Sequence, residues 1–181
     1  MTNGLVVMTP SSVAYSGTSA SINADGSVTF SACSSLSLNG VFTSDYDNYM
    51  IGIRVTSSLS STDINCRLRA SGSDASASND YVAQYLVADS TSVSAGRITA
   101  FTYGWLGQSY ATQRVGISGY IFGPYLTQPT AVRSIGASDN SSARLVDIAW
   151  THDLSTSYDG LTVFPSTGNF TGLLTVFGFN Q

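Results

Sequence analysis

The feature of this sequence that most limits its fold is a two-residue alternation of apolar with small or polar side chains. It is clearest over residues 49–56, where the apolar members are Tyr49, Ile51, Ile53 and Val55. Successive side chains of a β-strand point to opposite faces of its sheet, so this period indicates a half-buried strand. Similar segments lie at residues 28–30, 36–41, 64–68, 81–88, 98–105, 115–121, 130–135, 144–150, 161–164 and 171–179.

Strands at this spacing, separated by short polar turns, are typical of a β-sandwich or barrel. The composition agrees, because the sequence has no lysine and no glutamate, two residues that favour helices. Serine and threonine together supply 50 of the 181 residues. Charged residues make up only 10% of the chain, against about 25% in an average domain. We therefore expect an all-β fold with one hydrophobic core.

The first 26 residues show no clear strand period. We expect a short extended N-terminal arm over residues 1–26, followed by one β-sandwich domain over residues 27–181. An ordered arm would lie on a neighbouring subunit or on another protein. The alternative is that residues 1–26 form a frayed first strand of the domain.

Charge and hydropathy exclude several partners. The net charge is -4 and the chain has only seven cationic side chains, so it offers little to neutralise the phosphates of a nucleic acid. No apolar run approaches the roughly 18 residues that span a bilayer. The N-terminal residues lack the basic and apolar regions of a secretory signal, which predicts assembly in the cytoplasm. No cofactor-binding fingerprint is present, so we expect no cofactor.

The sequence offers little support for an enzyme. His152 is the only histidine, and the adjacent Asp153 would point to the opposite face of a strand. The competing interpretation places His152 as a polar residue at the rim of a strand. A glycosidase would need two opposed carboxyl groups. The spacing selects no pair among the candidate aspartates, so we expect no catalytic residue; the candidates are Asp45, Asp47, Asp147, Asp153 and Asp159.

Oxygen ligands for calcium occur close together at residues 45–48, 79–80 and 139–140. Aspartate and asparagine are also common in turns, which is the simpler explanation, so we expect no metal site. The two cysteines, Cys33 and Cys66, lack zinc-like spacing. Ile64, Cys66 and Leu68 alternate with Asn65, Arg67 and Arg69, which predicts a buried free thiol at Cys66.

Three arginines are candidates for a protein interface. Arg54, Arg67 and Arg69 fall on the outward faces of predicted strands. Arginine forms rigid bidentate pairs and suits interfaces better than lysine does. The alternative is ordinary pairing with aspartates on neighbouring strands, which contributes little to stability.

Tyrosines cluster in the middle of the chain, and most of them are expected in the core. Trp105 and Tyr110 flank the predicted loop at residues 106–109. Aromatic side chains on exposed loops can pack against a sugar ring because each presents a large apolar face and a polar edge. We therefore take Trp105 and Tyr110 as the candidate glycan contacts.

Four phrases of the sequence resemble a module of tailed-bacteriophage virion proteins. They are Phe42–Val55, Arg67–Asp74, Ser155–Pro165 and Thr171–Phe179. The resemblance covers roughly residues 28–179. Such modules occur in minor tail, fibre and capsid-associated proteins, so the phrases do not define a position in the virion. The resemblance implies a jelly-roll-like antiparallel β-sandwich, a homotrimer and no catalytic residue.

The leading interpretation is a non-enzymatic phage virion structural protein. We favour a capsid decoration, or cement, protein that binds itself and the major capsid protein and stabilises the shell. The compact size, the short arm and the low charge favour this. The alternative is a tail-associated receptor- or glycan-binding protein, favoured by the tyrosine-rich centre. A third hypothesis is an enzyme that degrades polysaccharide.

Overall fold

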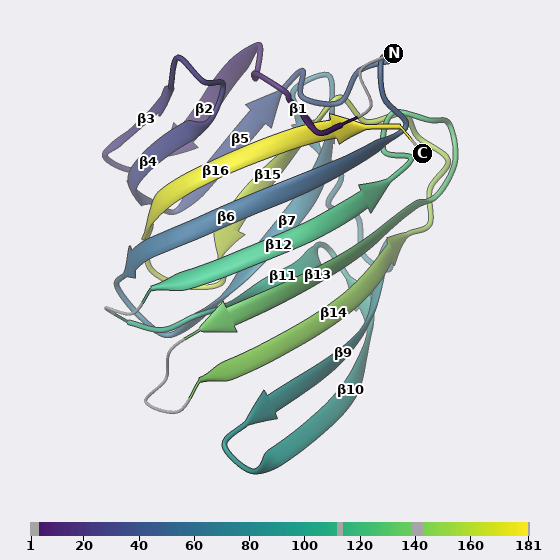
Figure 1. The fold of residues 1–181 in the computed structure, drawn as a ribbon. Coiled ribbons are helices and arrows are strands. Elements are labelled where there is room, and N and C mark those ends of the chain that lie inside the picture. The colour runs from purple at the N-terminus through teal and green to yellow at the C-terminus, as the bar shows by residue number, and fades with distance from the viewer. Residues whose placement is uncertain (1–3, 112–113, 139–142, 181) are drawn as a thin grey trace.

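A computed structural model describes residues 4–111, 114–138 and 143–180. Within these ranges all regular elements are β-strands, and they form an antiparallel sheet of ten strands and another of six (Figure 1). The two sheets face each other as a β-sandwich, which confirms the all-β expectation. No helix long and apolar enough to cross a membrane occurs in the described part of the chain.

The strands of the large sheet follow one another in space in an order that differs from the chain order. That order is β10 (Ser92–Phe101), β9 (Tyr81–Asp89), β14 (Arg144–His152), β13 (Thr130–Ser138), β12 (Val115–Phe122), β6 (Asn48–Ser58), β16 (Phe170–Phe179), β4 (Val28–Cys33) and β3 (Ser19–Ile22), with β1 (Val6–Val7) also paired to β16. The small sheet runs β11 (Gly104–Ser109), β7 (Thr62–Ala70), β15 (Gly160–Pro165), β5 (Ser35–Asn39) and β2 (Ser12–Ser16), with β8 (Ser73–Asp74) paired to β7.

The connections define a jelly roll. From β4 onward the chain crosses between the sheets from β4 to β5, β5 to β6, β6 to β7, β8 to β9, β10 to β11, β11 to β12, β14 to β15 and β15 to β16. These crossings place the order β4-β16-β6-β12 in one sheet opposite β5-β15-β7-β11 in the other, which is the double Greek key of a jelly roll. The hairpins β9–β10 and β13–β14 extend the large sheet beyond β12. The jelly-roll expectation is therefore confirmed.

The core lies between the sheets and follows the predicted alternation. The even-numbered apolar residues of β7, including Ile64, Cys66 and Leu68, are fully buried. Cys33 and Cys66 are free and buried, as expected for Cys66. Gly104 of β11 lies directly against the indole ring of Trp150, and a Cβ at that position would collide with the ring. The close packing of this core requires a glycine there.

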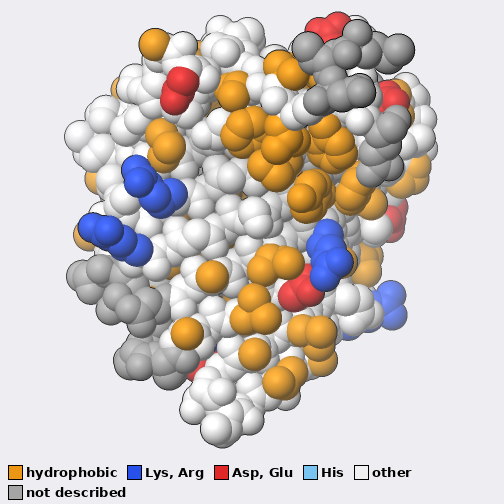
Figure 2. All heavy atoms as spheres, in the orientation of Figure 1, with side chains coloured by type: hydrophobic (Ala, Val, Ile, Leu, Met, Phe, Trp, Pro, Cys, Tyr) orange, Lys and Arg blue, Asp and Glu red, His pale blue; other side chains and the backbone are white. Residues whose placement is uncertain are grey.

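The large sheet also presents apolar side chains to solvent on its outer face. Figure 2 shows these side chains over the central and lower strands of the sheet. Exposed members are Leu86, Tyr120, Ile135 and Leu145. Beside them is an open hollow of about 520 Å³, lined in part by Ile135, Leu173 and Phe177.

One predicted strand is two strands in the structure. The segment 98–105 was expected to be continuous, but β10 ends at Phe101 and β11 begins at Gly104 in the other sheet. Ala100 has a φ of 66°, and the register of β10 with β9 shifts between Ile98 and Phe101. A bulge of this kind bends a strand, and here the chain passes from the large sheet to the small one just after it.

The N-terminal residues lie along the domain. The segment 1–26, expected as an extended arm, carries β1, β2 and β3, which pair with β16, β5 and β4 respectively. β2 and β3 form the outer strands of the two sheets and are largely exposed. Neither face of such a strand must be apolar, which explains why the sequence shows no strand period there.

Candidate ligand-binding groove

A groove lies where the β9–β10 hairpin of the large sheet meets β11 and β7 of the small sheet. Its volume is about 350 Å³, within the range of ordinary ligand sites, which starts near 300 Å³. The lining residues come from β7, β9, β10, β11 and the start of β14. We refer to this feature as the groove. It is the part of the surface where the candidate residue Trp105 is found.

Four aromatic side chains line the groove: Tyr85, Phe101, Tyr103 and Trp105. Tyr85 and Trp105 meet edge to face, with ring centroids 5.1 Å apart. Phe101 and Tyr103 form a second edge-to-face pair at 5.0 Å. The indole N–H of Trp105 donates to the carbonyl oxygen of Gly107 at 2.7 Å. The ring of Trp105 is therefore held in one position, with its polar atom already bonded.

The polar part of the groove is rich in acceptors. Gln108 donates its side-chain N–H to Asp63 Oδ1 at 2.9 Å, and Asn65 donates its own to Ser166 Oγ at 2.9 Å. The amide oxygens of Gln108 and Asn65 are buried and have no hydrogen-bond partner among the described residues. Leaving such a group unpaired costs about 1–3 kcal/mol. These oxygens lie beside the groove with almost no accessible surface, so a ligand that donates hydrogen bonds to them would recover that free energy once the amides turn toward it.

Tyr103 adds a hydroxyl to the same site. Burial, and after it the negative charge of Asp63, raise the pKa of Tyr103, while the more weakly acting Arg67 lowers it. The phenol is therefore protonated at neutral pH and can both donate and accept a hydrogen bond.

The two candidate glycan contacts lie in neighbouring hollows. Trp105 lines the groove, whereas Tyr110 lines an adjacent hollow of about 240 Å³. The side chains of Asp63 and Gln108 border both hollows. The hydroxyl of Tyr110 accepts a hydrogen bond from Arg144, whose guanidinium also lies over the Tyr110 ring at 5.7 Å.

Arg144 connects the two hollows electrostatically. Its Nη1 lies 3.0 Å from Asp89 Oδ2, so its charge is paired within the chain. Its Nε is buried without a hydrogen-bond partner among the described residues. Arg144 also lines the groove. Its guanidinium supplies hydrogen-bond donors, whereas the amide oxygens of Asn65 and Gln108 supply acceptors.

His152 is the last residue of β14, but its side chain is not exposed at the end of that strand. Its side chain is fully buried, with the rings of Tyr81 and Tyr158 at centroid distances of 4.5 and 5.1 Å. The Tyr158 hydroxyl lies 3.2 Å from His152 Nδ1. Burial lowers the pKa of His152, opposed by the nearby Asp80 and Asp153 carboxylates. These contacts place His152 in the core, outside the groove.

The aspartates considered for catalysis or metal binding are dispersed. Asp147 pairs with Arg133 at 2.9 Å on the large sheet, while Asp159 accepts the backbone N–H of Ser71 at 3.1 Å. Across the ranges that the structure describes, no three acidic, histidine or cysteine side chains cluster as metal ligands would. The candidate calcium ligands at residues 139–140 lie outside the described residues.

The three candidate interface arginines differ in environment. Arg54 is exposed on the outer face of the large sheet. Arg67 donates through Nε to the carbonyl oxygen of Thr102 at 3.0 Å and lies over the Phe164 ring at 4.7 Å. Arg69 lies on the face of β7 opposite to its apolar residues, and it is buried there.

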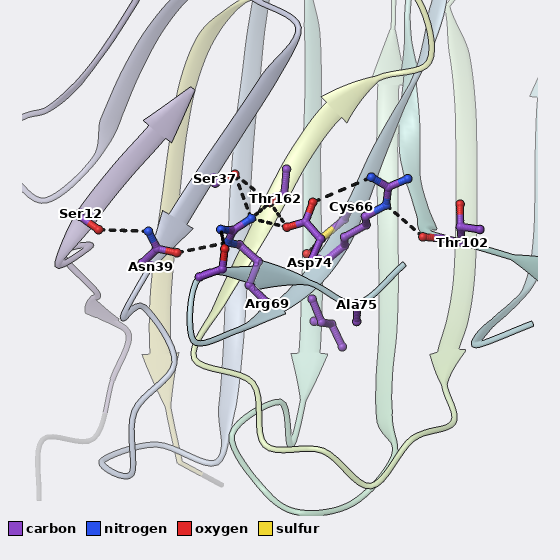
Figure 3. Close-up of polar contacts among 12 residues, drawn as sticks. Ser12, Ser37, Asn39, Cys66, Arg69, Asp74, Ala75, Thr102 and Thr162 are labelled. Carbon is purple, nitrogen blue, oxygen red and sulfur yellow. Dashed lines mark hydrogen bonds and ion pairs between the residues drawn. The ribbon is translucent and has the colours of Figure 1, made fainter. Parts of the chain in front are cut away.

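Arg69 is buried because a polar network surrounds it on the outer face of the small sheet (Figure 3). Its guanidinium pairs with Asp74, and it also donates to Asn39 Oδ1 at 3.1 Å and to Thr162 Oγ1 at 2.8 Å. Asn39 in turn donates to Ser12 Oγ at 3.0 Å. The network thereby joins β2, β5, β15, β7 and β8.

Sequence reasoning missed most of the groove. Asp63 and Asn65 lie two residues apart on the face of β7 opposite to its buried apolar residues, so the alternation could have marked them as one polar pair. Their partner Gln108 depends on the pairing of β11 with β7, whose register shifts between Trp105 and Gly107. The contribution of Tyr85 depends on how the large sheet folds against β11. No local pattern encodes these long-range contacts.

No family model matches this chain, and no significant match was found among curated proteins. Among solved structures, the chain has a weak similarity to the CBM2 module of an evolved Dit from Lactobacillus casei BL23 phage J-1. The TM-score is 0.34 with 13% sequence identity, over 98% of this chain and 96% of the other. Values this low establish neither shared ligand nor shared function.

Proposed function

We propose that this chain is a non-enzymatic glycan-binding β-sandwich of a phage particle. The observation that carries the proposal is the groove, in which aromatic rings stand beside buried amide oxygens without partners. A sugar ring has apolar C–H faces and hydroxyl groups at its edge. The rings of Tyr85 and Trp105 suit the first, and the oxygens of Asn65 and Gln108 suit the second.

The phage assignment is supported by the sequence phrases that resemble virion modules, of which Thr171–Phe179 is the last strand of the jelly roll. A tail-associated receptor- or glycan-binding protein is also the alternative that the sequence favours after capsid decoration. A receptor- or glycan-binding role on the tail requires a site that recognises small polar ligands, and the groove has the composition of one.

Capsid decoration is a second candidate, and a separate observation favours it. The outer face of the large sheet exposes Leu86, Tyr120, Ile135 and Leu145 (Figure 2). An exposed apolar surface of this kind marks a site of contact with another protein. In that role the chain would bind the major capsid protein, itself as a trimer, or both.

A glycan array with the purified chain tests the first proposal. We expect binding to a defined subset of glycans, and loss of that binding in Trp105→Ala. Tyr120→Ala is the matched control, because it removes an exposed aromatic ring from the other face of the molecule. Absence of binding to any glycan, or equal binding by both variants, would refute the role of the groove.

Sedimentation with empty phage shells tests the second candidate. If the chain decorates capsids, it should sediment with shells, and Ile135→Asp with Leu145→Asp should abolish this. Sedimentation that does not depend on these two residues would remove the apolar face as the docking surface.

A further inference from the structure

We propose that the groove binds uncharged, hydroxyl-rich sugars and rejects acidic sugars. This inference rests on the proposed glycan-binding function and specifies its ligand class. The hydrogen-bonding capacity of the groove decides the ligand class, because some of its polar atoms are bonded within the chain and others have no partner.

The amide atoms near Asp63 that lack a hydrogen-bond partner are acceptors. The hydrogen bond from Gln108 Nε2 to Asp63 Oδ1 fixes the orientation of the Gln108 amide, because a carboxylate accepts from the N–H side alone. The Gln108 amide oxygen is then the atom without a partner. The Asn65 amide N–H is on Ser166 Oγ and its oxygen is unpaired, but a hydroxyl can donate or accept, so only the Gln108 amide has its orientation fixed by its partner. A ligand at this point must therefore donate.

Trp105 and Arg144 use their donors within the chain, whereas the Tyr103 hydroxyl can still donate or accept. The indole N–H of Trp105 is bonded to Gly107 O. Arg144 is paired with Asp89 and bonded to the Tyr110 hydroxyl, so its positive charge is balanced within the chain, and its remaining Nε is buried. Because Arg144 and Asp89 together carry no net charge, the carboxylate of Asp63 makes the groove negative. Arg97 of β10 pairs across to Gln84 and falls on the opposite face of the hairpin from Tyr85, so it does not offset this charge.

These features discriminate between two kinds of sugar. The hydroxyl groups of a neutral hexose can donate to the oxygens of Asp63, Asn65 and Gln108 while a C–H face packs on Tyr85 or Trp105. A uronic acid would bring a carboxylate to the same oxygens, where it meets like charge and has no hydrogen to donate. The groove is thus selective by what it repels as well as by what it binds.

The test is calorimetric titration of the full chain at low ionic strength. The ligands are neutral gluco-, galacto- and manno-hexasaccharides and, matched in length, hexagalacturonate and a glucuronate-containing hexasaccharide. We expect a neutral hexasaccharide to bind about tenfold or more tighter than the acidic ones. Asp63→Asn removes the charge with little change of shape and should reduce the ratio of the affinity for the neutral hexasaccharide to that for the acidic ones. Asp147→Asn, on the outer face of the large sheet, is the control and should leave it unchanged.

The outcomes separate this inference from the function on which it rests. Acidic sugars that bind as tightly as neutral ones, with binding lost in Trp105→Ala, would overturn the ligand class and leave glycan binding in place. A ratio that Asp63→Asn does not change would also overturn it, because Asp63 would not be the selecting group. Absence of binding to every ligand would overturn both proposals. Thermal unfolding of each variant shows whether the fold is retained.

Discussion

Tyr85 of the large sheet and Trp105 of the small sheet meet edge to face, with their ring centroids 5.1 Å apart. The contact joins β9 to β11 at the edge of the sandwich and forms one wall of the groove. Gly96 of β10 lies opposite Tyr85 in the register, and the phenol ring occupies the space that a Cβ at Gly96 would fill. The position of this wall therefore depends on a residue that has no side chain.

Replacing Gly96 by alanine should displace the Tyr85 ring and weaken glycan binding. The new methyl group would collide with ring atoms of Tyr85, so the ring must move from its contact with Trp105. We expect glycan affinity to fall about fivefold or more, which corresponds to about 1 kcal/mol. Gly116→Ala is the matched control, since a Cβ at Gly116 meets no atom within 4 Å. Equal affinity of the two variants would contradict the account of the wall.

Replacing the buried Arg69 by methionine should strongly destabilise the domain. The change removes the partner of Asp74 and the donors to Asn39 and Thr162. Breaking a buried ion pair from one side costs about 3–5 kcal/mol. Urea denaturation should show a loss of that size, whereas Arg54→Met, at an exposed position, should change the free energy of unfolding by about 0.5 kcal/mol or less. Similar values for the two variants would show that the network contributes little.

The free energy of unfolding should decrease as the pH falls below about 6.5. Burial lowers the pKa of His152 below its ordinary value of 6.5. Between that lowered pKa and 6.5, the unfolded chain binds a proton that the folded chain does not, so acid favours unfolding there. Below the lowered pKa both states are protonated, and this contribution to the slope ends.

Denaturation at a series of pH values measures this slope, which for one proton is at most about 1.4 kcal/mol per pH unit. His152→Gln should remove the part of the slope that lies just below 6.5, and the remaining acid sensitivity would belong to aspartates. An unchanged slope in His152→Gln would show that His152 is not the responsible group.

Longer oligosaccharides should bind more tightly than shorter ones. The groove and the neighbouring hollow share Asp63 and Gln108, so a ligand longer than one or two sugar units can reach both. Tyr110 lines the neighbouring hollow and reaches the groove only through its hydrogen bond with Arg144, so Tyr110→Ala should lower the affinity for a hexasaccharide about fivefold and that for a disaccharide much less. Titration with both lengths checks this. A loss that is the same for both would place Tyr110 in one continuous site with Trp105.

Much of the architecture could be predicted from the sequence, because burial on one face imposes a two-residue period. The strands around Ile51, Ile117 and Val132 each show it, and each is present. The period fails where neither face is buried. Ser92–Gly96, which lies between the predicted strands at residues 81–88 and 98–105, is the first half of β10, an edge strand that is largely exposed on both sides.

The groove was only partly predictable for a different reason. Trp105 was identified by its residue type and its place in a polar segment, although the structure puts it in β11 and not beside a loop. Asn65 and Tyr85 were not identified, because their role arises from contacts between strands that are distant in the sequence. The alternation gives the face of β7 on which Arg69 lies but not what covers that face, so the burial of Arg69 could not be predicted.

Trp105 and Trp150 provide the most direct test of the central claim that the groove binds glycan. Trp105 lines the groove, whereas Trp150 is buried in the core behind Gly104. Titration of a neutral hexasaccharide into the isotopically labelled chain, followed through the two indole N–H signals by NMR, compares both residues in one sample. The account predicts a shift of the Trp105 signal with an unmoved Trp150 signal. Saturating ligand that leaves the Trp105 signal in place would contradict it.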